Sequence, residues 1–292
     1  MEVIVGKTAG FCFGVQNAVV KTEELLDKEE IIYCLGELVH NSQVMDRLCR
    51  KGLKVIDDIK KADSKVIIRA HGVPPKIYEE ASGSGVELVD FTCPKVAKIH
   101  EKAKSYVENN FYIFIFGAKE HPEIIGTYGF CEGKASVIET KEDIEKAIEE
   151  FSKSKLQNLA IISQTTFSAQ KFNELVEEVE EKIFSGNKGV YSIKLKIDNT
   201  ICNTTFERQK EAEILSKTVE LMIIIGGKNS SNTKKLYEVS SKYCNNVILI
   251  ETAKELDISN IKNYNKIGIM AGASTPKESI DEVVEVLNGN SK

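Results

Sequence analysis

The stretch FYIFIFGAKEHPE, residues 111–123, joins a short apolar run to a polar turn that carries a histidine and a glutamate. Similar stretches recur as VIIRAHGVPP at 66–75, LMIIIGGKNSSN at 221–232 and IGIMAGASTP at 267–276. Each apolar run has the length of a strand, and each polar turn precedes a segment with helical periodicity. This alternation predicts an α/β fold with mainly parallel sheets, whose ligand sites lie at the carboxyl ends of the strands.

The same pattern extends over the whole chain. The expected strands are 3–5, 31–35, 66–69, 86–89, 111–116, 135–138, 159–162, 191–197, 221–225, 247–250 and 267–270. The expected helices are 15–27, 43–51, 75–82, 95–109, 141–152, 168–184, 205–218, 233–243 and 276–287. No long linker or low-complexity segment separates them, so the units are expected to pack directly on one another.

Composition limits the classes of protein that fit. The chain has 292 residues, of which 42% are hydrophobic, enough for two domains or three small ones. Its net charge of −5 argues against a nucleic-acid binder that neutralises phosphates. No apolar run reaches the roughly 20 residues of a membrane span, and the N-terminus lacks a signal-peptide pattern. We therefore expect a cytoplasmic protein with neither a membrane nor a nucleic-acid partner.

Three of the seven cysteines share one position in the pattern. Cys12, Cys93 and Cys202 each follow a strand candidate and open a helix, whereas the other four are expected to be packing residues. The repeat predicts three small α/β domains: 1–93, which includes the N-terminal strand, then 94–198 and 199–292. Each is too small for a large core of its own, so we expect them to pack around a shared centre.

Three thiolates from separate segments form an incomplete tetrahedral donor set. Thiolates select iron–sulfur clusters, zinc or copper(I), and no C-x-x-C motif is present to suggest a zinc ribbon or a thioredoxin-type site. A cubane cluster with three cysteine ligands leaves one iron free to act as a Lewis acid. A single zinc on the same cysteines is the alternative, and periodicity alone does not decide between them.

The polar turns at the strand ends supply neutral hydrogen-bond donors. They are His40, His71, His121, Thr165, Ser230, Ser231, Asn232 and Ser274. Together with helix N-termini and glycine-rich turns, such donors suit a phosphate group. The spacing matches neither a Walker loop nor a dinucleotide fingerprint, so nucleotide binding has no support. Glu123, beside His121, is the candidate acid for a reductive C–O cleavage.

These blocks resemble the 4-hydroxy-3-methylbut-2-enyl diphosphate reductase family almost from end to end, from GFC at 10–12 to AGAS at 271–274. The resemblance implies three α/β domains in a pseudo-threefold arrangement around a [4Fe–4S] cluster. Its ligands would be Cys12, Cys93 and Cys202, with one iron lacking a protein ligand. The diphosphate site would comprise His40, His71, His121, Ser230, Ser231, Asn232 and Ser274. Thr165 would lie near the substrate hydroxyl, Glu123 would be the proton donor, and these two with His121 would form the catalytic set.

The implied reaction is a two-electron, two-proton reductive dehydroxylation of an allylic diphosphate, the last step of the non-mevalonate isoprenoid pathway. It would give isopentenyl and dimethylallyl diphosphate, with electrons from a donor such as ferredoxin or flavodoxin. The cluster would carry the redox chemistry, and the protein would supply orientation and charge stabilisation.

Two other functions fit part of the pattern. One is a three-domain cluster enzyme of the quinolinate synthase type, which shares a cysteine tripod but is disfavoured by the HPE and SSN turns at 121–123 and 230–232. The other is a binding or structural module that holds one zinc and has no turnover. Iron and sulfide analysis separates the zinc module from both cluster enzymes.

Overall fold

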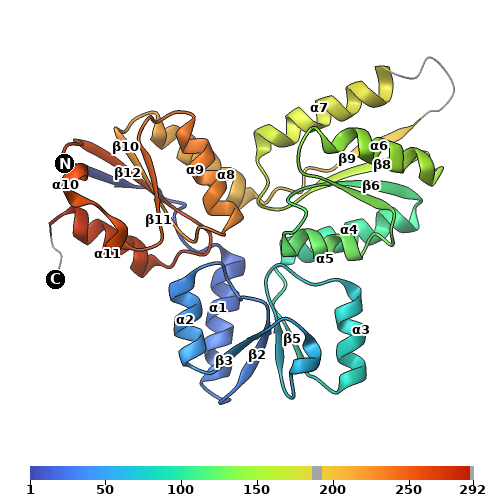
Figure 1. The fold of residues 1–292 in the computed structure, drawn as a ribbon, viewed down its shortest axis with the longest axis horizontal. Helices are drawn as coiled ribbons and strands as arrows, with labels where there is room; N and C mark the ends of the chain where they lie inside the picture. The colour runs from blue at the N-terminus through green and yellow to red at the C-terminus, as the bar shows by residue number, and fades with distance from the viewer. Residues whose placement is uncertain (186–192, 290–292) are drawn as a thin grey trace. The chain divides into compact units, whose positions relative to one another are not determined.

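The computed structural model describes residues 1–185 and 193–289, and its elements are labelled in Figure 1. Residues 191–192 of the expected strand 191–197 lie outside the described residues. The strands are β1 (Glu2–Val5), β2 (Ile32–Leu35), β3 (Leu53–Ile56), β4 (Val66–Ile68), β5 (Leu88–Asp90), β6 (Phe111–Phe116), β7 (Ala135–Ile138), β8 (Asn158–Ser163), β9 (Lys194–Ile197), β10 (Leu221–Ile225), β11 (Val247–Ile250) and β12 (Lys266–Ala271).

Helices follow most of these strands, as the sequence pattern predicts. The α-helices are α1 (Phe13–Leu26), α2 (Ser42–Arg50), α3 (Pro75–Ser84), α4 (Pro94–Glu108), α5 (Pro122–Gly129), α6 (Asp143–Ser154), α7 (Ala169–Ser185), α8 (Asn203–Ser216), α9 (Ser231–Ser241), α10 (Ile258–Ile261) and α11 (Lys277–Leu287). Prolines open α3, α4 and α5, where a missing N–H costs nothing and the fixed φ suits a first turn.

The strands form three four-stranded sheets, in the orders β1-β12-β10-β11, β3-β2-β4-β5 and β7-β6-β8-β9. The pairs β1–β12, β10–β12 and β10–β11 are parallel, as are β2–β4 and β4–β5. The pairs β6–β7, β6–β8 and β8–β9 are parallel as well. The predicted α/β class with mainly parallel sheets is therefore confirmed.

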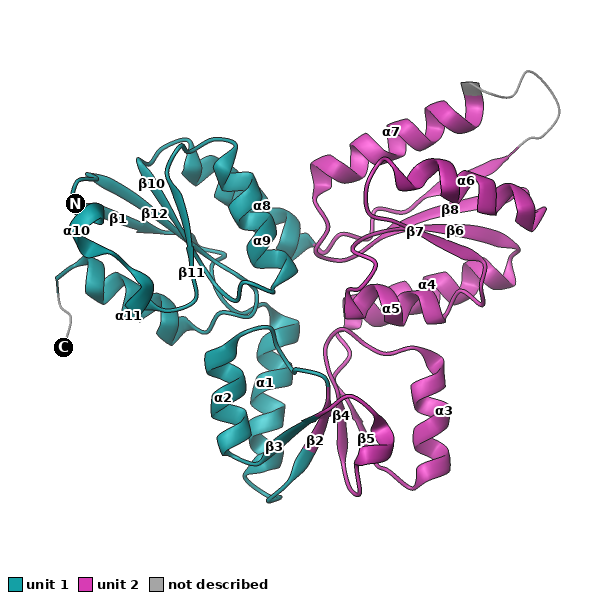
Figure 2. Cartoon of the chain, viewed as in Figure 1, with its two compact units in different colours: residues 1–32, 36–55, 203–292 teal, residues 33–35, 56–202 magenta. Residues whose placement is uncertain are grey.

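The chain divides into two compact units, which Figure 2 colours separately. Unit 1 comprises residues 1–32, 36–55 and 203–292, and unit 2 comprises residues 33–35 and 56–202. The expected domain limits of 1–93, 94–198 and 199–292 stay a prediction. One detail differs from it: β1, expected in the first domain, pairs with β12 near the end of the chain. β12 has two edges for strand pairing, and because β10 occupies one of them, β1 pairs along the other.

The core of unit 1 lies on both faces of the β1-β12-β10-β11 sheet (Figure 1). Alternate residues of β10 point to opposite faces, as the period of a strand requires. Leu221, Ile223 and Ile225 pack in one cluster with side chains of α10 and α11, among them Ile261, Ile280, Val283 and Leu287. Met222 and Ile224 pack in a second cluster with Ala212 and Leu215 of α8 and Leu236 of α9.

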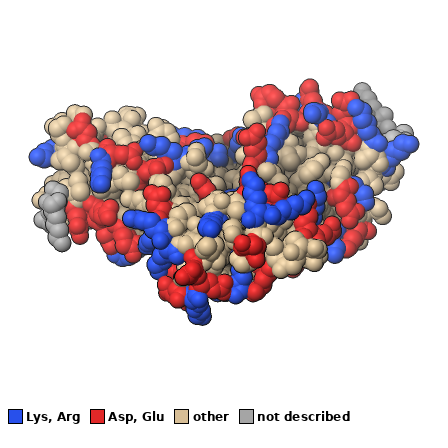
Figure 3. All heavy atoms as spheres, turned by 60° about the horizontal axis from the view of Figure 1, so that its bottom comes forward, with Lys and Arg blue, Asp and Glu red and all other residues tan. Residues whose placement is uncertain are grey.

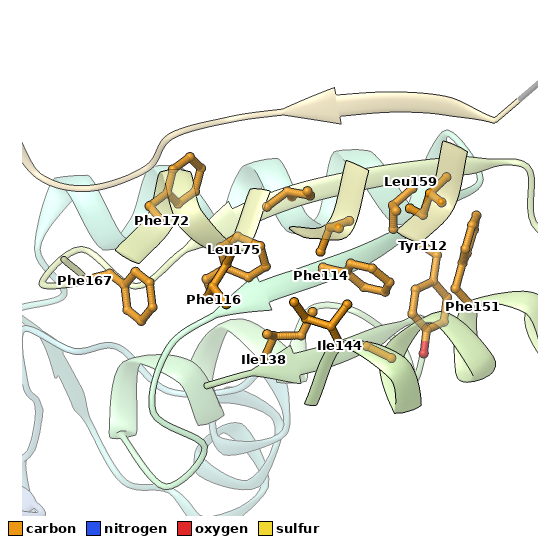
Figure 4. Close-up of a cluster of buried hydrophobic side chains, with 14 residues drawn as sticks. Tyr112, Phe114, Phe116, Ile138, Ile144, Phe151, Leu159, Phe167, Phe172 and Leu175 are labelled. Carbon is orange, nitrogen blue, oxygen red and sulfur yellow. The ribbon is translucent and has the colours of Figure 1, made fainter. Parts of the chain in front are cut away.

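Unit 2 repeats this plan around β6, whose six residues are all buried. Tyr112, Phe114 and Phe116 pack against α6 and α7 in the cluster shown in Figure 4. The alternate residues Phe111, Ile113 and Ile115 pack against α4 and α5 on the opposite face. This two-sided burial fixes α4 and α5, whose N-terminal turns carry predicted site residues.

The visible surface in Figure 3 carries lysines and arginines interspersed with aspartates and glutamates. No continuous basic patch is present on that face, in agreement with the net charge of −5. Among the described residues, no helix combines the length and the apolar composition that a bilayer span requires.

Candidate functional site

The three predicted ligand cysteines lie at the starts of helices. Cys12 and Cys93 are the N-caps of α1 and α4, and Cys202 directly precedes α8. None of the three forms a disulfide, and all are partly exposed. Helix N-termini favour negative charge, so each position suits a thiolate that binds a metal.

The other cysteines have different surroundings. Cys34, Cys131 and Cys244 are buried, and burial raises the pKa of the Cys131 thiol to about 12. They are packing residues, as the sequence predicts. Cys49 differs from that expectation, because it is exposed on α2.

Each candidate ligand cysteine is hydrogen-bonded through its backbone to a loop that carries another predicted site residue. The bonds run from Cys12 N–H to the Ala273 carbonyl (3.2 Å), from Cys93 N–H to the Ala70 carbonyl (3.0 Å) and from Cys202 N–H to the Thr165 carbonyl (3.0 Å). Ala273 precedes Ser274, and Ala70 precedes His71. The cysteines are thus fixed to the predicted binding loops within each unit, a regularity that the sequence did not reveal.

Glu123 and Thr165 form a closed pair inside unit 2. Glu123 is 2% exposed, and its Oε1 accepts from the Thr165 N–H at 2.6 Å. Its Oε2 accepts from the Thr165 hydroxyl at 2.7 Å. Because the Thr165 carbonyl also accepts from Cys202 N–H, one residue links the candidate acid to a candidate metal ligand.

Burial raises the pKa of the Glu123 carboxyl from 4.5 to about 7, although the hydrogen bonds from Thr165 act in the opposite direction. A buried carboxyl therefore holds a proton in the neutral pH range. This is the property that a general acid needs, since the best catalytic acids titrate near the operating pH.

The raised pKa predicts a pH-dependent stability. Between about pH 4.5 and pH 7 the folded chain binds a proton at Glu123 that the unfolded chain does not bind. The stabilising effect of this proton is complete below the unfolded-state pKa and is lost as the pH rises through the folded-state pKa. The loss of unfolding free energy is at most about 3 kcal/mol. We expect the difference in unfolding free energy between wild type and Glu123→Gln to change over this range. Denaturant titrations at several pH values measure this difference. If the unfolding free energies of the two proteins changed with pH in parallel, the assignment would be contradicted.

His121 and His71 lie next to each other in unit 2. Their ring centroids are 5.3 Å apart in an edge-to-face arrangement. His121 is the N-cap of α5, and its Nδ1 accepts from the Glu123 N–H at 3.1 Å. That bond leaves the Nε2 position of a neutral His121 ring as the N–H donor, which suits an anionic ligand.

Close contacts at two glycines of α5 hold this helix against the loop that carries His71. A Cβ on Gly129 of α5 would lie 2.3 Å from Pro74 Cβ, and one on Gly126 would lie 3.4 Å from His100 Nε2 and 3.5 Å from Val73 N. His100 is buried and stacks on Phe130, and burial lowers the pKa of its ring to about 4. It is a neutral structural histidine that supports the loop carrying His71.

Unit 1 brings the loops around His40 and Ser274 together. The Ser274 hydroxyl donates to the His40 carbonyl at 3.1 Å. The same carbonyl lies 2.3 Å from where a Cβ on Gly227 would stand, so only glycine permits this approach. The His40 ring contacts the Glu37 carboxylate, with 3.3 Å between Nδ1 and Oε2.

Ser230 and Asn232 lie at the N-terminus of α9 in the same unit. Ser230 is the N-cap and accepts from Thr233 N–H, and Ser231 is the first helical residue. Asn232 is 4% exposed, yet neither atom of its side-chain amide has a hydrogen-bond partner among the described residues. A buried amide without partners is costly, so both of its polar atoms are available to a ligand.

The structure thus groups the predicted residues within each unit. Unit 1 contains Cys12, His40, Ser230, Ser231, Asn232 and Ser274, and unit 2 contains His71, Cys93, His121, Glu123, Thr165 and Cys202. Sequence reasoning missed Arg208 and Glu211, which bind the Cys12 loop. Only the contacts of the folded chain distinguish them from ordinary helix charges.

The fold and these side chains define an α/β enzyme. It has three cysteines at helix starts, a buried carboxyl with a pKa near neutrality, and neutral hydrogen-bond donors suited to an anion. Residues 3–288 match the family model described as "LytB protein". The chain belongs to this family.

Curated relatives cover almost the entire chain. The protein of Alkaliphilus oremlandii is 41% identical over 99% of both chains, and that of Aquifex aeolicus is 39% identical over 97% of this chain and 94% of its own. Both are named 4-hydroxy-3-methylbut-2-enyl diphosphate reductase. The resemblance to that family, inferred from the sequence, is confirmed.

Two solved structures have the same fold. The E-1-hydroxy-2-methyl-but-2-enyl-4-diphosphate reductase of Plasmodium falciparum superposes with a TM-score of 0.87 and 28% identity, covering 98% of this chain and 88% of that one. A structure described as (E)-4-hydroxy-3-methyl-but-2-enyl diphosphate reductase, the terminal enzyme of the non-mevalonate pathway, gives a TM-score of 0.70 and 37% identity. It covers 99% of this chain and 100% of its own.

Proposed function

We propose that this chain reduces 4-hydroxy-3-methylbut-2-enyl diphosphate in the last step of the non-mevalonate pathway. Two electrons and two protons break the allylic C–O bond, release water and give isopentenyl and dimethylallyl diphosphate. The observation that carries the proposal is the buried, hydrogen-bonded pair of Glu123 and Thr165. The carbonyl of Thr165 also accepts from the Cys202 N–H. These bonds connect a candidate proton donor to a candidate metal ligand. Relatives named for this reaction align with almost the whole of this chain.

The donor set fits an iron–sulfur cluster. Cys12, Cys93 and Cys202 are partly exposed cysteines at helix starts that form no disulfide, and soft thiolate ligands select such clusters. We propose that they hold a [4Fe–4S] cluster in which one iron lacks a protein ligand. When bound, the cluster supplies the electrons and a Lewis-acid site for the substrate oxygen.

Glu123 holds the proton that the departing hydroxyl requires. Its burial keeps the carboxyl protonated up to about pH 7, and both of its oxygens are oriented by Thr165. When the Thr165 hydroxyl donates to the substrate hydroxyl, its oxygen can accept from the protonated Glu123 carboxyl, so Thr165 can pass the proton of Glu123 to the departing oxygen. His121 fixes the backbone of Glu123 through its Nδ1.

Neutral donors would bind the diphosphate. In this proposal the binding residues are His40, His71, His121, Ser230, Ser231, Asn232 and Ser274. The free amide of Asn232 and the N-terminus of α9 support this role, because backbone N–H groups at a helix start bind phosphate oxygens. Fixed dipoles can hold an anion without a concentrated basic surface, which is consistent with the net charge of −5.

Asn232→Leu is expected to weaken substrate binding without destabilising the folded chain. The unliganded chain is expected to keep its stability, because the substitution removes an amide that has no partner among the described residues. Substrate affinity is expected to fall roughly 10- to 100-fold, the cost of one hydrogen bond to a charged group. Equilibrium binding and thermal unfolding measure the two effects, with Asn245→Leu at an exposed loop position as the control. Equal affinity in wild type and Asn232→Leu would remove Asn232 from the site.

The function is tested by anaerobic assay of the purified chain with the diphosphate and an artificial one-electron reductant. Formation of the two isoprenoid diphosphates, with iron and sulfide bound to the chain, supports the proposal. Zinc without sulfide and no turnover would leave a metal-binding module instead, and turnover of a substrate that lacks a diphosphate would favour another class of cluster enzyme.

The reaction consumes two electrons per turnover, so the chain needs an external electron donor. We propose a small one-electron carrier such as ferredoxin or flavodoxin, and a cytoplasmic location in which such carriers meet the enzyme. The mixed surface charges in Figure 3 and the net charge of −5 give no support for a nucleic-acid partner.

A further inference from the structure

Two charged residues of α8 bind the loop that ends at Cys12. We define the Cys12 loop as residues 6–12 and the clamp as Arg208 with Glu211. The Glu211 carboxylate accepts from Lys7 N–H at 2.7 Å, from Thr8 N–H at 2.8 Å and from the Thr8 hydroxyl at 2.5 Å. Arg208 donates from Nε to the Thr8 carbonyl at 2.7 Å and from Nη2 to the Gly10 carbonyl at 2.8 Å.

Burial strengthens the hydrogen bonds of Arg208, whereas those of Glu211 lie closer to the surface. Arg208 is 2% exposed and is among the largest fully buried side chains. Hydrogen bonds to charged groups contribute more than neutral ones, and a buried guanidinium that lost its acceptors would be left with a large desolvation cost. The pair therefore restricts the backbone of residues 7–10 to one conformation.

The remaining backbone of the loop is bound as well. Gly6 N–H donates to the Ile269 carbonyl, Ala9 N–H to the Gly6 carbonyl, and Cys12 N–H to the Ala273 carbonyl. Gly10 has a φ of +102°, a conformation that side-chain-bearing residues rarely adopt. The path that leads to the Cys12 thiol is thus fixed by the chain itself, on both sides of the turn.

A related arrangement occurs in unit 2. Lys102 and Tyr106 of α4 both bind the Asp198 carboxylate, which lies four residues before Cys202. The helix after Cys93 therefore holds the segment before Cys202, as the helix after Cys202 holds the segment before Cys12. The repetition argues that these contacts serve the cysteines and are not incidental helix charges.

We propose that Arg208 and Glu211 are positioning residues that hold Cys12 ready to bind the cluster before the cluster arrives. The inference rests on the proposed function, because it concerns the same cluster. It predicts that weakening the clamp lowers cluster retention more than it lowers the stability of the chain without cluster. A clamp that merely supports the fold would destabilise both forms equally.

The experiment compares anaerobically reconstituted wild type with Glu211→Gln, Arg208→Lys and Thr8→Val. The rate of iron release to a ferrous chelator is expected to rise roughly tenfold in Glu211→Gln and Arg208→Lys, as for loss of partners that orient a metal ligand. Arg208→Lys keeps the charge and loses the two-pronged geometry. Thr8→Val removes a single bond to Glu211 and is expected to show a smaller rise, so it remains informative if a larger change prevents folding.

Glu213→Gln is the matched control. Glu213 lies two residues further along α8 and pairs with Lys217 on the surface, so the same chemical change there should leave iron release at the wild-type rate. Melting temperatures with and without cluster complete the test, since a ligand stabilises by its affinity for the folded form.

Faster iron release with a smaller gap between the two melting temperatures supports the clamp. Unchanged release, or equal losses of stability with and without cluster, would overturn it while leaving the proposed function intact. Failure of the proposed function has a different signature, because wild type itself would then retain no iron and sulfide, or would retain them without reducing the diphosphate.

Discussion

Replacement of Cys12, Cys93 or Cys202 by serine is expected to lower turnover by on the order of 10³-fold or more, through loss of the cluster. A hydroxyl is a poor ligand for iron compared with a thiolate, and a cubane with three protein ligands has none to spare. Iron and sulfide per chain, measured after anaerobic purification, should fall together with activity.

The three substitutions should act as one unit. Residues that jointly hold a single group have non-additive effects, so a double variant is expected to be no worse than either single one. Cys49→Ser is the matched control, because Cys49 is an exposed thiol on α2 that opens no helix. Full iron and sulfide content in any of the three single variants would remove that cysteine from the ligand set.

Glu123→Gln is expected to lower the maximal rate roughly 10²- to 10⁴-fold, the usual contribution of a general acid, while the cluster is retained. Glutamine fits the pocket, because its carbonyl can accept from the Thr165 N–H while its amide donates to the Thr165 hydroxyl oxygen. The change therefore removes the transferable proton and keeps the shape. Substrate affinity should stay close to that of wild type.

The pH profile gives the second signature of Glu123. In wild type the maximal rate should fall as the pH rises through about 7, where the carboxyl loses its proton. In Glu123→Gln most of the rate should be lost, and the remaining rate should no longer fall as the pH rises through about 7. Glu120→Gln, at an exposed position in the same turn, controls for loss of charge. Near-normal turnover in Glu123→Gln would assign the proton to another group.

The fold was largely predictable, because buried parallel strands appear as uninterrupted apolar runs. β6 and β10 are buried along their whole length, and their limits match the expected ones. β3 escaped prediction because its four residues include an exposed lysine and an exposed valine, which weaken the apolar signal. α5 escaped because Pro122, Gly126 and Gly129 disfavour a helix, whereas close packing on the loop beside Pro74 compensates for them.

The sequence indicates the candidate site residues, but it does not indicate how they are connected. Histidine, serine and cysteine at strand ends are visible in the sequence, since their position follows from the strand–turn–helix pattern. The bond from Cys202 N–H to the Thr165 carbonyl is not visible, and neither is the burial of Arg208. Both depend on which segments meet in the folded chain. An arginine followed three residues later by a glutamate in a helix normally indicates a solvated face.

The central claim is that three thiols of this chain hold a cluster with one iron open to the substrate. Mössbauer spectroscopy of the anaerobic chain, with and without 4-hydroxy-3-methylbut-2-enyl diphosphate, tests it most directly. The account predicts that the signal of a single iron shifts when the diphosphate is added, while the others stay unchanged. A chain that contains no iron–sulfur signal, or one whose irons all ignore the diphosphate, would contradict it.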